Sequence, residues 1–251
     1  MRPLILISND DGYHAKGIKM LTDMVKGIGD IIVCAPDSAR SGFSRAFSMS
    51  PLSFKKYSHE DYEDTTIDIY RCSGTPVDCV KMAYSQVCPR KPSLVLGGIN
   101  HGDNASTNSQ YSGTVGIVIE GALKKIPSVA FSLCEYGDDL DFEPIRPLVQ
   151  KIVKKVLAEG LPEYACLNVN VPTDWNGETK LCRMAHGHWR NEVEKRERPG
   201  SGTPYYWMTG YYQNDEPNAE DTDAWAIAHG YAAITPLTAD HTCRDITKFE
   251  I

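Results

Sequence analysis

The sequence contains no hydrophobic run long enough to cross a lipid bilayer, which takes about 20 apolar residues. The first apolar run covers residues 4–7, and the polar stretch 8–11 interrupts it at once. A secretory signal peptide needs an apolar region of about 7–15 residues behind a basic start, so the N-terminus does not match one. We therefore expect a cytoplasmic protein without membrane association.

Positive charge is also in short supply. The chain has 26 Lys and Arg against 33 Asp and Glu, a formal net charge of −7. A general nucleic-acid binder usually presents a basic face, so this balance argues against one. It does not exclude a small phosphate-bearing ligand, because the local field around a site decides such binding.

Close cysteine pairs are missing as well. No two of the eight cysteines have C-x-x-C spacing, which is typical of metal sites and redox motifs. Scattered cysteines of this kind favour buried free thiols in a reducing compartment. They are Cys34, Cys72, Cys79, Cys88, Cys134, Cys166, Cys182 and Cys243.

Several catalytic motifs are absent. There is no G-x-G-x-x-G after the first predicted strand, no lysine-containing phosphate loop and no G-x-S-x-G. These absences disfavour a dinucleotide dehydrogenase, a P-loop NTPase and a serine hydrolase. A phosphatase with an aspartyl nucleophile usually has alternating Asp residues after its first strand, whereas Asp10 and Asp11 are adjacent.

What is present is the pattern of an α/β protein. The 251 residues are 41% hydrophobic and 24% charged, as is typical of a globular chain with a substantial core. Short apolar runs alternate with helical patterns, which predicts a mostly parallel sheet with helices on both faces. The expected strands are 3–7, 31–34, 94–96, 129–131 and 167–171, and the expected helices 18–25, 76–87, 115–122 and 145–157. Residues 47–57 and 66–72 are expected to form an extended pair, with 60–64 as its exposed turn.

The pattern changes after Pro172. Residues 180–215 have no long helical period and are predicted to form strands and an extended hairpin, followed by a short helix at 223–228 and a strand at 231–236. We therefore divide the chain into a catalytic core, 1–175, and a C-terminal segment, 176–251. That segment contains a hairpin at about 190–212 and a strand that returns to the core.

Adjacent Asp10 and Asp11 are the sharpest chemical signal. Because ligands of an open parallel sheet bind beyond the carboxyl ends of its strands, the loops after successive strands are expected to meet. Two carboxylates there repel, and a buried pair needs a cation or a shared proton. With a hydroxyl such as Ser41 and an amide oxygen such as Asn100, they form an all-oxygen set that suits Mg²⁺ or Mn²⁺. The alternative is that residues 9–12 form only a polar turn.

Two helix starts carry weaker signals. Small and hydroxyl residues at 112–114 expose backbone N–H groups and so make an anion site, or else Ser112 or Thr114 is a plain N-cap. At 74–78 we favour capping by Thr75. His186 and His188 lie on one strand face, but no third metal ligand is evident beside them.

The hairpin is rich in aromatic side chains, which favour interfaces, and a lone hairpin is marginal in water. We therefore expect it to pack on another subunit, the alternative being a hairpin folded back on its own domain. Its aromatic residues are Trp189, Tyr205, Tyr206, Trp207, Tyr211 and Tyr212.

Taken together, the motifs resemble the SurE (survival protein E) family of metal-dependent 5′/3′-nucleotidases. The likeness runs in family order over nearly the whole chain. It is carried by residues 7–12 with 17–18, 35–37 with 40–44, 74–80, 98–104, 111–115 with 120–122, 167–172, and 230–231 with 234–237.

The resemblance implies a Rossmann-like core, a C-terminal segment that reaches across to a partner subunit, and a homodimer or homotetramer. It implies one divalent cation per subunit, Mg²⁺ or Mn²⁺, at the positions matching Asp10, Asp11, Ser41 and Asn100. It implies phosphate contacts from the positions matching Asn9, Asn104, Ser112, Gly113 and Thr114. The implied activity is that of a phosphoric monoester hydrolase, which converts nucleoside 5′-monophosphates, and in some members 3′-monophosphates, to nucleoside and phosphate.

One segment departs from the family pattern. Between Asn104 and Tyr111 the family often has a glycine and an acidic residue, whereas this chain has Ala-Ser-Thr-Asn-Ser-Gln. The pocket rim and substrate preference are therefore expected to differ. Asp10 or Asp11 is the candidate base for an attacking water, and the sequence leaves the choice open. The rival hypothesis is a metal-dependent nucleotide sensor with little turnover.

Overall fold

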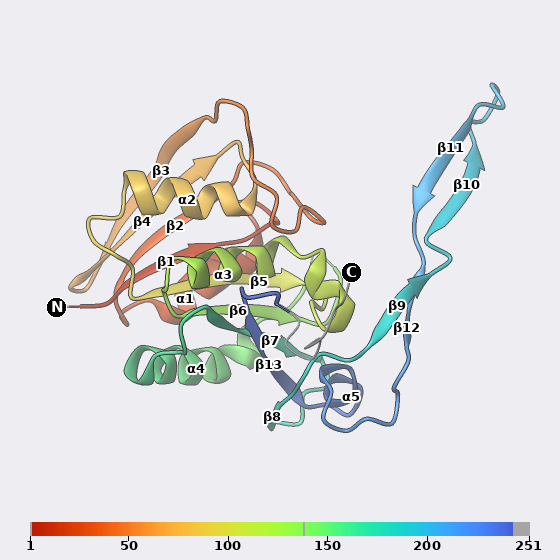
Figure 1. Cartoon of the computed structure of the whole chain (residues 1–251). Coiled ribbons are helices and arrows are strands. Elements are labelled where there is room, and N and C mark those ends of the chain that lie inside the picture. Colours follow the sequence, from red (N-terminus) through yellow and green to blue (C-terminus); the bar gives the residue numbers. More distant parts are fainter. Residues whose placement is uncertain (1, 138, 243–251) are drawn as a thin grey trace, which may run out of the picture.

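The computed structural model describes residues 2–137 and 139–242. Its centre is a nine-stranded sheet (Figure 1), in which six consecutive strands from β4 to β7 are parallel and β3 and β13 run antiparallel to them. From edge to edge the strands are β3 (Phe54–Tyr62), β4 (Thr65–Cys72), β2 (Asp30–Pro36), β1 (Leu4–Ser8), β5 (Leu94–His101), β6 (Ser128–Leu133), β7 (Ala165–Val171), β13 (Ala232–Thr238) and β8 (Thr179–Leu181). Within the described ranges no helix is both long and apolar enough to cross a membrane.

Helices cover both faces of this sheet, as the alternating sequence pattern predicts. One face packs against α1 (Lys16–Val25), the 3₁₀ turn η2 (Glu143–Ile145) and α4 (Arg146–Glu159). The other packs against α2 (Pro76–Gln86) and α3 (Gly113–Leu123). The central strands are therefore buried on both sides, which explains why β1, β5 and β6 are near-continuous apolar runs rather than alternating ones.

Local sequence sets the starts of two helices. Thr75 accepts a hydrogen bond from the Asp78 N–H, and the Asp78 carboxylate accepts one from the Thr75 N–H, which together form a capping box on α2. Ser112 caps α3 by accepting from the Val115 N–H. Both caps satisfy backbone donors that the first helical turn would otherwise leave unpaired.

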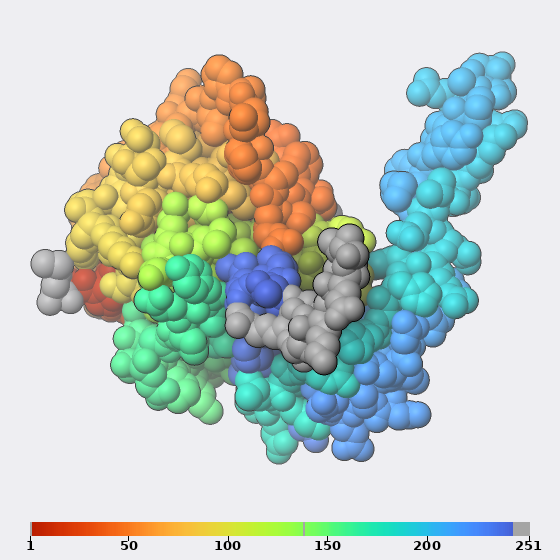
Figure 2. Space-filling model, in the orientation of Figure 1, coloured from red at the N-terminus to blue at the C-terminus, as the bar shows by residue number. Residues whose placement is uncertain are grey.

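The C-terminal part adds to the sheet and then leaves it. β13 and β8 extend the sheet beyond β7, and α5 (Asp223–Ala228) packs on β13. Between them, β9 (Gly187–Arg190) pairs with β12 (Tyr211–Asn214), and β10 (Val193–Glu197) pairs with β11 (Pro204–Met208). We call this ribbon, residues 187–214, the arm. Figures 1 and 2 show that it projects away from the body of the molecule.

The extended pair at the other edge differs from the prediction in its bounds. β3 begins at Phe54, so residues 47–53 lie outside the strand that we predicted to include them. It continues to Tyr62, so residues 60–62, which we expected in the exposed turn, are paired with β4. Only residues 63 and 64 separate the two strands. The acidic residues are tolerated because β3 is an edge strand and most of its side chains are exposed. Cys243 lies outside the described residues.

The connections create a switch point at the centre of the sheet. From β1 the chain moves by α1 to β2 on one side, whereas β5 pairs with the other side of β1. Ligands of open α/β sheets bind at such a point, beyond the carboxyl ends of the strands. Gly17 lets α1 lie against the end of β5, since a Cβ at this position would be 2.0 Å from the Ile99 carbonyl oxygen.

Candidate active site

A cavity of about 240 Å³ opens at the carboxyl ends of β1 and β5. The loop after β1, the loop after β2, the end of β5, the start of α3 and the first strand of the arm all contribute to its lining. The lining residues are Asp10, Ser41, Gly42, Asn100, His101, Asp103, Asn104, Asn108, Tyr111, Ser112, Tyr136 and Trp189. The loops that the sequence pattern expects to meet therefore do so.

Asp10 is buried and firmly held. Its Oδ1 accepts a 2.6 Å hydrogen bond from Thr114 Oγ1, and the N–H groups of Gly113 and Thr114 also donate to the carboxylate. Burial raises the pKa of Asp10 above its usual range, and these hydrogen bonds only partly oppose that rise. The N-terminus of α3 is thus directed at the Asp10 carboxylate.

Asp11 is strained electrostatically. Burial, and then the neighbouring charge of Asp10, raise its pKa to about 7, while a hydrogen bond from the His101 backbone lowers it. Its Oδ2 is buried and has no hydrogen-bond partner among the described residues. A cation between the two carboxylates would relieve both problems, because it would offset their repulsion and coordinate the unpaired oxygen.

Asn100 and Ser41 are the other two oxygen donors predicted from the sequence, and both line the cavity with Asp10, whereas Asp11 is absent from its lining. The Asn100 amide nitrogen donates to the carbonyl oxygens of His101, at 3.2 Å, and Gly102, at 2.8 Å. These two bonds orient the side chain and leave its amide oxygen for a ligand. Ser41 is exposed on the loop after β2. Two carboxylates, an amide oxygen and a hydroxyl fit Mg²⁺ or Mn²⁺ better than a thiolate-binding metal.

Alternative metal sites are not supported. Within the described ranges, no group of three His, Cys, Asp or Glu side chains is arranged to hold a metal ion. His186 Nδ1 lies 3.5 Å from Glu216, and His188 Nδ1 lies 3.3 Å from Asp215. The two imidazoles therefore pair with different acidic residues, and a metal at the acid pair depends on Ser41 and Asn100.

The residues expected to contact phosphate fall into two groups. Asn104 and Ser112 line the cavity, whereas Asn9, Gly113 and Thr114 are absent from its lining. Asn9 instead ties its own loop, donating to the Gly12 carbonyl oxygen at 3.0 Å and accepting from the Gly12 N–H at 3.2 Å. Thr114 is fully buried and bonded to Asp10.

Asn104 is supported by a set of buried amides for which the sequence alone indicated no role. Its Nδ2 donates to Ser132 Oγ at 2.9 Å, its N–H donates to Asn170 Oδ1 at 2.7 Å, and its carbonyl oxygen accepts from Asn168 Nδ2 at 2.8 Å. Asn168 and Asn170 are polar positions in the otherwise apolar strand β7. That interruption was the available signal, because a buried polar residue needs a hydrogen-bond partner.

Sequence reasoning also missed the aromatic rim of the cavity. Tyr111, Tyr136 and Trp189 line it, and the exposed fractions of the two tyrosines are 56% and 76%. Trp189 belongs to β9 of the arm, more than 60 positions along the chain from every other lining residue except Tyr136. We expected its indole at a subunit contact.

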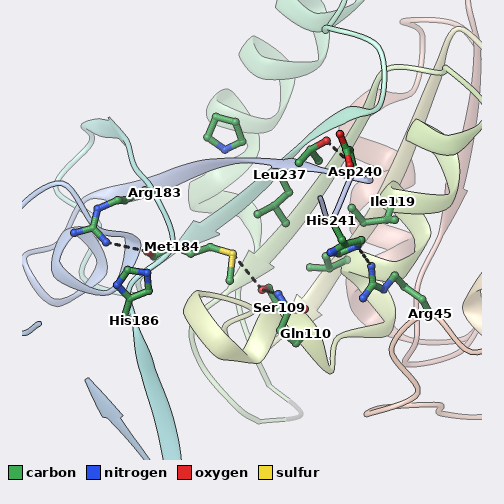
Figure 3. Close-up of a pocket in the computed structure, with 13 residues that line it drawn as sticks. Arg45, Ser109, Gln110, Ile119, Arg183, Met184, His186, Leu237, Asp240 and His241 are labelled. Carbon is green, nitrogen blue, oxygen red and sulfur yellow. Dashed lines mark hydrogen bonds between the residues drawn. The ribbon is translucent and has the colours of Figure 1, made fainter. Parts of the chain in front are cut away.

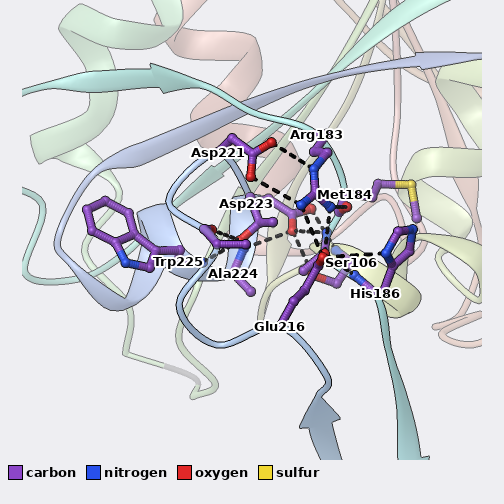
Figure 4. A network of polar contacts seen from close by, with 12 residues as sticks. Ser106, Arg183, Met184, His186, Glu216, Asp221, Asp223, Ala224 and Trp225 are labelled. Atoms are coloured by element: carbon purple, nitrogen blue, oxygen red, sulfur yellow. Dashed lines mark hydrogen bonds and ion pairs between the residues drawn. The ribbon is translucent and has the colours of Figure 1, made fainter.

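A buried carboxylate secures the base of the arm (Figure 4). Asp223 accepts from both the N–H and the Oγ of Ser106, each at 2.7 Å, and from the Ala185 N–H at 2.9 Å. Beside it, Arg183 forms ion pairs with Glu216 and Asp221. These contacts join the 3₁₀ turn η1 (Ser106–Gln110), which carries the departure from the family pattern, to α5 and to the segment that leads into the arm.

A second cavity, of about 410 Å³, also borders η1 (Figure 3). Arg45 and His241 lie in contact on one side of it, while Arg183 and His186 lie on the other. Among the described residues, the only acidic side chain in its lining is that of Asp240. Because this lining offers no carboxylate pair, the smaller cavity is the better candidate for metal-assisted chemistry.

Comparisons with known proteins agree with these observations. The family model described as "Survival protein SurE" matches residues 5–191. The 5′-nucleotidase SurE of Phocaeicola vulgatus is 49% identical over 96% of this chain and 93% of its own length, and that of Bacteroides fragilis is 46% identical with the same coverage. The crystal structure of the SurE protein from Aquifex aeolicus superposes with a TM-score of 0.79 at 36% identity, covering 98% of this chain and 97% of that one.

Proposed function

The chain belongs to the SurE family, and from that premise we propose how its site hydrolyses phosphate esters. The protein is a 5′-nucleotidase, an enzyme that converts nucleoside monophosphates to nucleoside and phosphate. The observation that carries the mechanism is the Asp10–Asp11 pair at the switch point, where one buried carboxylate oxygen has no partner in the described part of the chain.

We assign one divalent cation per subunit, Mg²⁺ or Mn²⁺, to Asp10, Asp11, Ser41 and Asn100. When bound, such an ion supplies charge neutralisation for the phosphoryl oxygens and makes water more acidic. Three donors from Thr114 and the backbone at 113–114 hold the Asp10 carboxylate, which keeps the site organised before substrate arrives. Either Asp10 or Asp11 accepts the proton of the attacking water.

Asn104 and Ser112 contact the phosphoryl oxygens from the cavity wall. Asn104 is fixed from behind by β6 and β7, so its position costs little reorganisation when substrate binds. The positive end of the α3 dipole lies at the same place and favours an anion there. Direct phosphate contacts by Asn9, Gly113 and Thr114 remain predictions, and the contacts above support a role for them in holding Asp10 and its loop.

The arm supports assembly into a homodimer or homotetramer. Its outer part exposes large apolar side chains, with exposed fractions of 65% for Tyr206, 54% for Trp207 and 72% for Met208. A two-stranded ribbon with so few contacts to its own body gains stability by packing on another subunit. The seven cysteines of the described ranges are all free, which supports the expected cytoplasmic location.

The test is phosphate release from AMP, GMP and CMP with Mn²⁺ or Mg²⁺, with and without a chelator. We expect turnover that disappears on chelation and returns when metal is added back. A nucleotide sensor would instead bind AMP in a metal-dependent manner and release little or no phosphate from it. Metal-independent turnover would contradict the assigned role of the acid pair.

A further inference from the structure

Trp189 differs from the other aromatic residues of the cavity rim. Tyr136 is three-quarters exposed and Tyr111 more than half exposed, whereas Trp189 is half-buried and still lines the cavity. Gly210 lies against the indole, since a Cβ there would be 3.4 Å from Trp189 Cε3. Trp189 is therefore the least exposed of the three rings, and part of its surface faces the site.

The polar atom of this indole is satisfied inside the protein. Trp189 Nε1 donates to Asn108 Oδ1 at 2.9 Å, and Asn108 Nδ2 donates to Asp103 Oδ1 at 3.0 Å. The relay fixes the plane of the ring. It also commits the only N–H of the indole, so the ring offers a ligand its π surface rather than a hydrogen bond.

The same turn anchors the strand that carries the ring. Thr107 Oγ1 donates to the Gly187 carbonyl oxygen at 2.9 Å, and Ser106 is bonded twice to Asp223. The segment that departs from the family pattern therefore bonds β9 through two successive side chains, Thr107 and Asn108, while Ser106 ties the same turn to Asp223 of α5. A ring on an exposed ribbon is in this way made part of a preorganised wall.

A nucleoside monophosphate combines a charged phosphate with a planar aromatic base, and the cavity lining combines polar side chains with aromatic rings. Asp10, Ser41 and Asn100 lie at the strand ends, and the aromatic residues form the rim. Resting on the proposed nucleotidase function, we propose that Trp189 is the stacking surface for the nucleobase and that Asn108 is its positioning residue. Stacking accepts any base, so this contact favours nucleotides over base-free phosphates without selecting one base.

The experiment compares the KM for AMP with the inhibition constant of inorganic phosphate, which lacks a base. Loss of a stacked base costs about 5- to 150-fold in binding, so Trp189→Leu should raise the KM for AMP within that range and leave phosphate inhibition unchanged. Trp189→Phe should retain most of the affinity for AMP that Trp189→Leu loses. Asn108→Ala should raise the KM for AMP and leave the inhibition constant of phosphate unchanged. Trp175→Leu is the matched control, because its indole is also half-buried and also bonded internally, to the Glu178 carbonyl oxygen at 2.7 Å, away from the cavity.

Each result decides the question. An unchanged KM for AMP in Trp189→Leu would overturn the proposal, as would equal weakening of AMP and phosphate, which indicates a purely structural role. If the unsubstituted protein releases no phosphate, the nucleotidase function fails separately. Calorimetric binding of AMP in the presence of Mn²⁺ then tests the stacking surface alone, with weaker binding expected for Trp189→Leu and unweakened binding overturning it.

Discussion

Replacing Asp11 by asparagine should stabilise the metal-free protein while abolishing most of its turnover. The Asp11 carboxylate is partly buried beside Asp10, and its buried Oδ2 has no partner within the described ranges. An asparagine keeps the shape and can still accept from the His101 backbone, but it carries no charge. The substitution therefore removes the repulsion that a cation would otherwise offset.

The expected gain in the free energy of unfolding follows from the raised pKa of Asp11. Burial and the charge of Asp10 raise the pKa of Asp11 from 3.8 to about 7, a difference of about 3 units at 1.36 kcal/mol each, or about 4 kcal/mol at most. Solvent reaches part of Asp11, which screens the interaction, so we expect about 1–3 kcal/mol. For a chain of this size that corresponds to roughly 2–12 °C in Tm.

Because the pKa of Asp11 is raised rather than lowered, the stability gain from Asp11→Asn depends on pH in a characteristic way. A carboxylate whose folded pKa lies above its unfolded value binds more protons in the folded state, so the metal-free protein loses stability as pH rises from about 4 to about 7. The asparagine side chain of the variant does not titrate. The stability difference between the variant and the unsubstituted protein should therefore be small at pH 4, grow across that window and level off above it.

The assay is thermal unfolding of both proteins in chelator at several pH values, and again in Mn²⁺. Ligand binding stabilises the folded state, so metal should raise the Tm of the unsubstituted protein more than that of the variant and remove or reverse the difference. Asp10→Asn is the matched control. Its amide would place hydrogens against the donors of Thr114 and the α3 backbone, so it should destabilise the protein although it too removes a charge.

Two outcomes would refute this reasoning. One is an Asp11→Asn variant that is less stable than the unsubstituted protein at pH 8 without metal. The other is near-normal turnover in that variant, which would mean that the chemistry lies elsewhere.

Further predictions concern the helix start, the assembly and the substrate. Gly113→Ala should lower turnover by about 10- to 100-fold, because its Cβ would lie 2.8 Å from Asp10 Cβ and 2.9 Å from Asp10 Oδ2. Unchanged metal affinity by calorimetry and unchanged kcat/KM would show that Asp10 tolerates the methyl group. Light scattering at micromolar concentration should give a mass of at least twice 27.9 kDa. The double change Trp207→Ser with Met208→Ser should reduce that mass. A monomeric mass for the unsubstituted protein would exclude assembly through the arm. Phosphate monoesters should be strongly preferred over diesters of the same alcohol, because a diester has one charge fewer for the cation and adds a group where Ser112 and the start of α3 meet the cavity. Comparable rates for both would place the phosphate site in another loop.

Features that depend on neighbours in the sequence were predictable. The capping box of Thr75 and Asp78 spans three residues, and Ser112 caps α3 over the same distance. The predicted extended pair was wrong at both ends of its first strand: residues 47–53 lie outside β3, and residues 60–62 remain paired with β4. Acidic side chains there suggested a turn, but an edge strand accepts them because solvent reaches one side of it.

The sequence by itself determined the parallel α/β core, its helix starts and the acid pair after β1, because short-range sterics, periodicity and capping act within a few residues. Only the tertiary structure decided what surrounds that pair. Thr114 reaches Asp10 from 104 positions away, and Trp189 reaches Asn108 from 81. Such contacts arise when separate elements pack, and no local pattern marks them. The start of α3 holds the Asp10 carboxylate, and an aromatic residue of the arm lines the cavity.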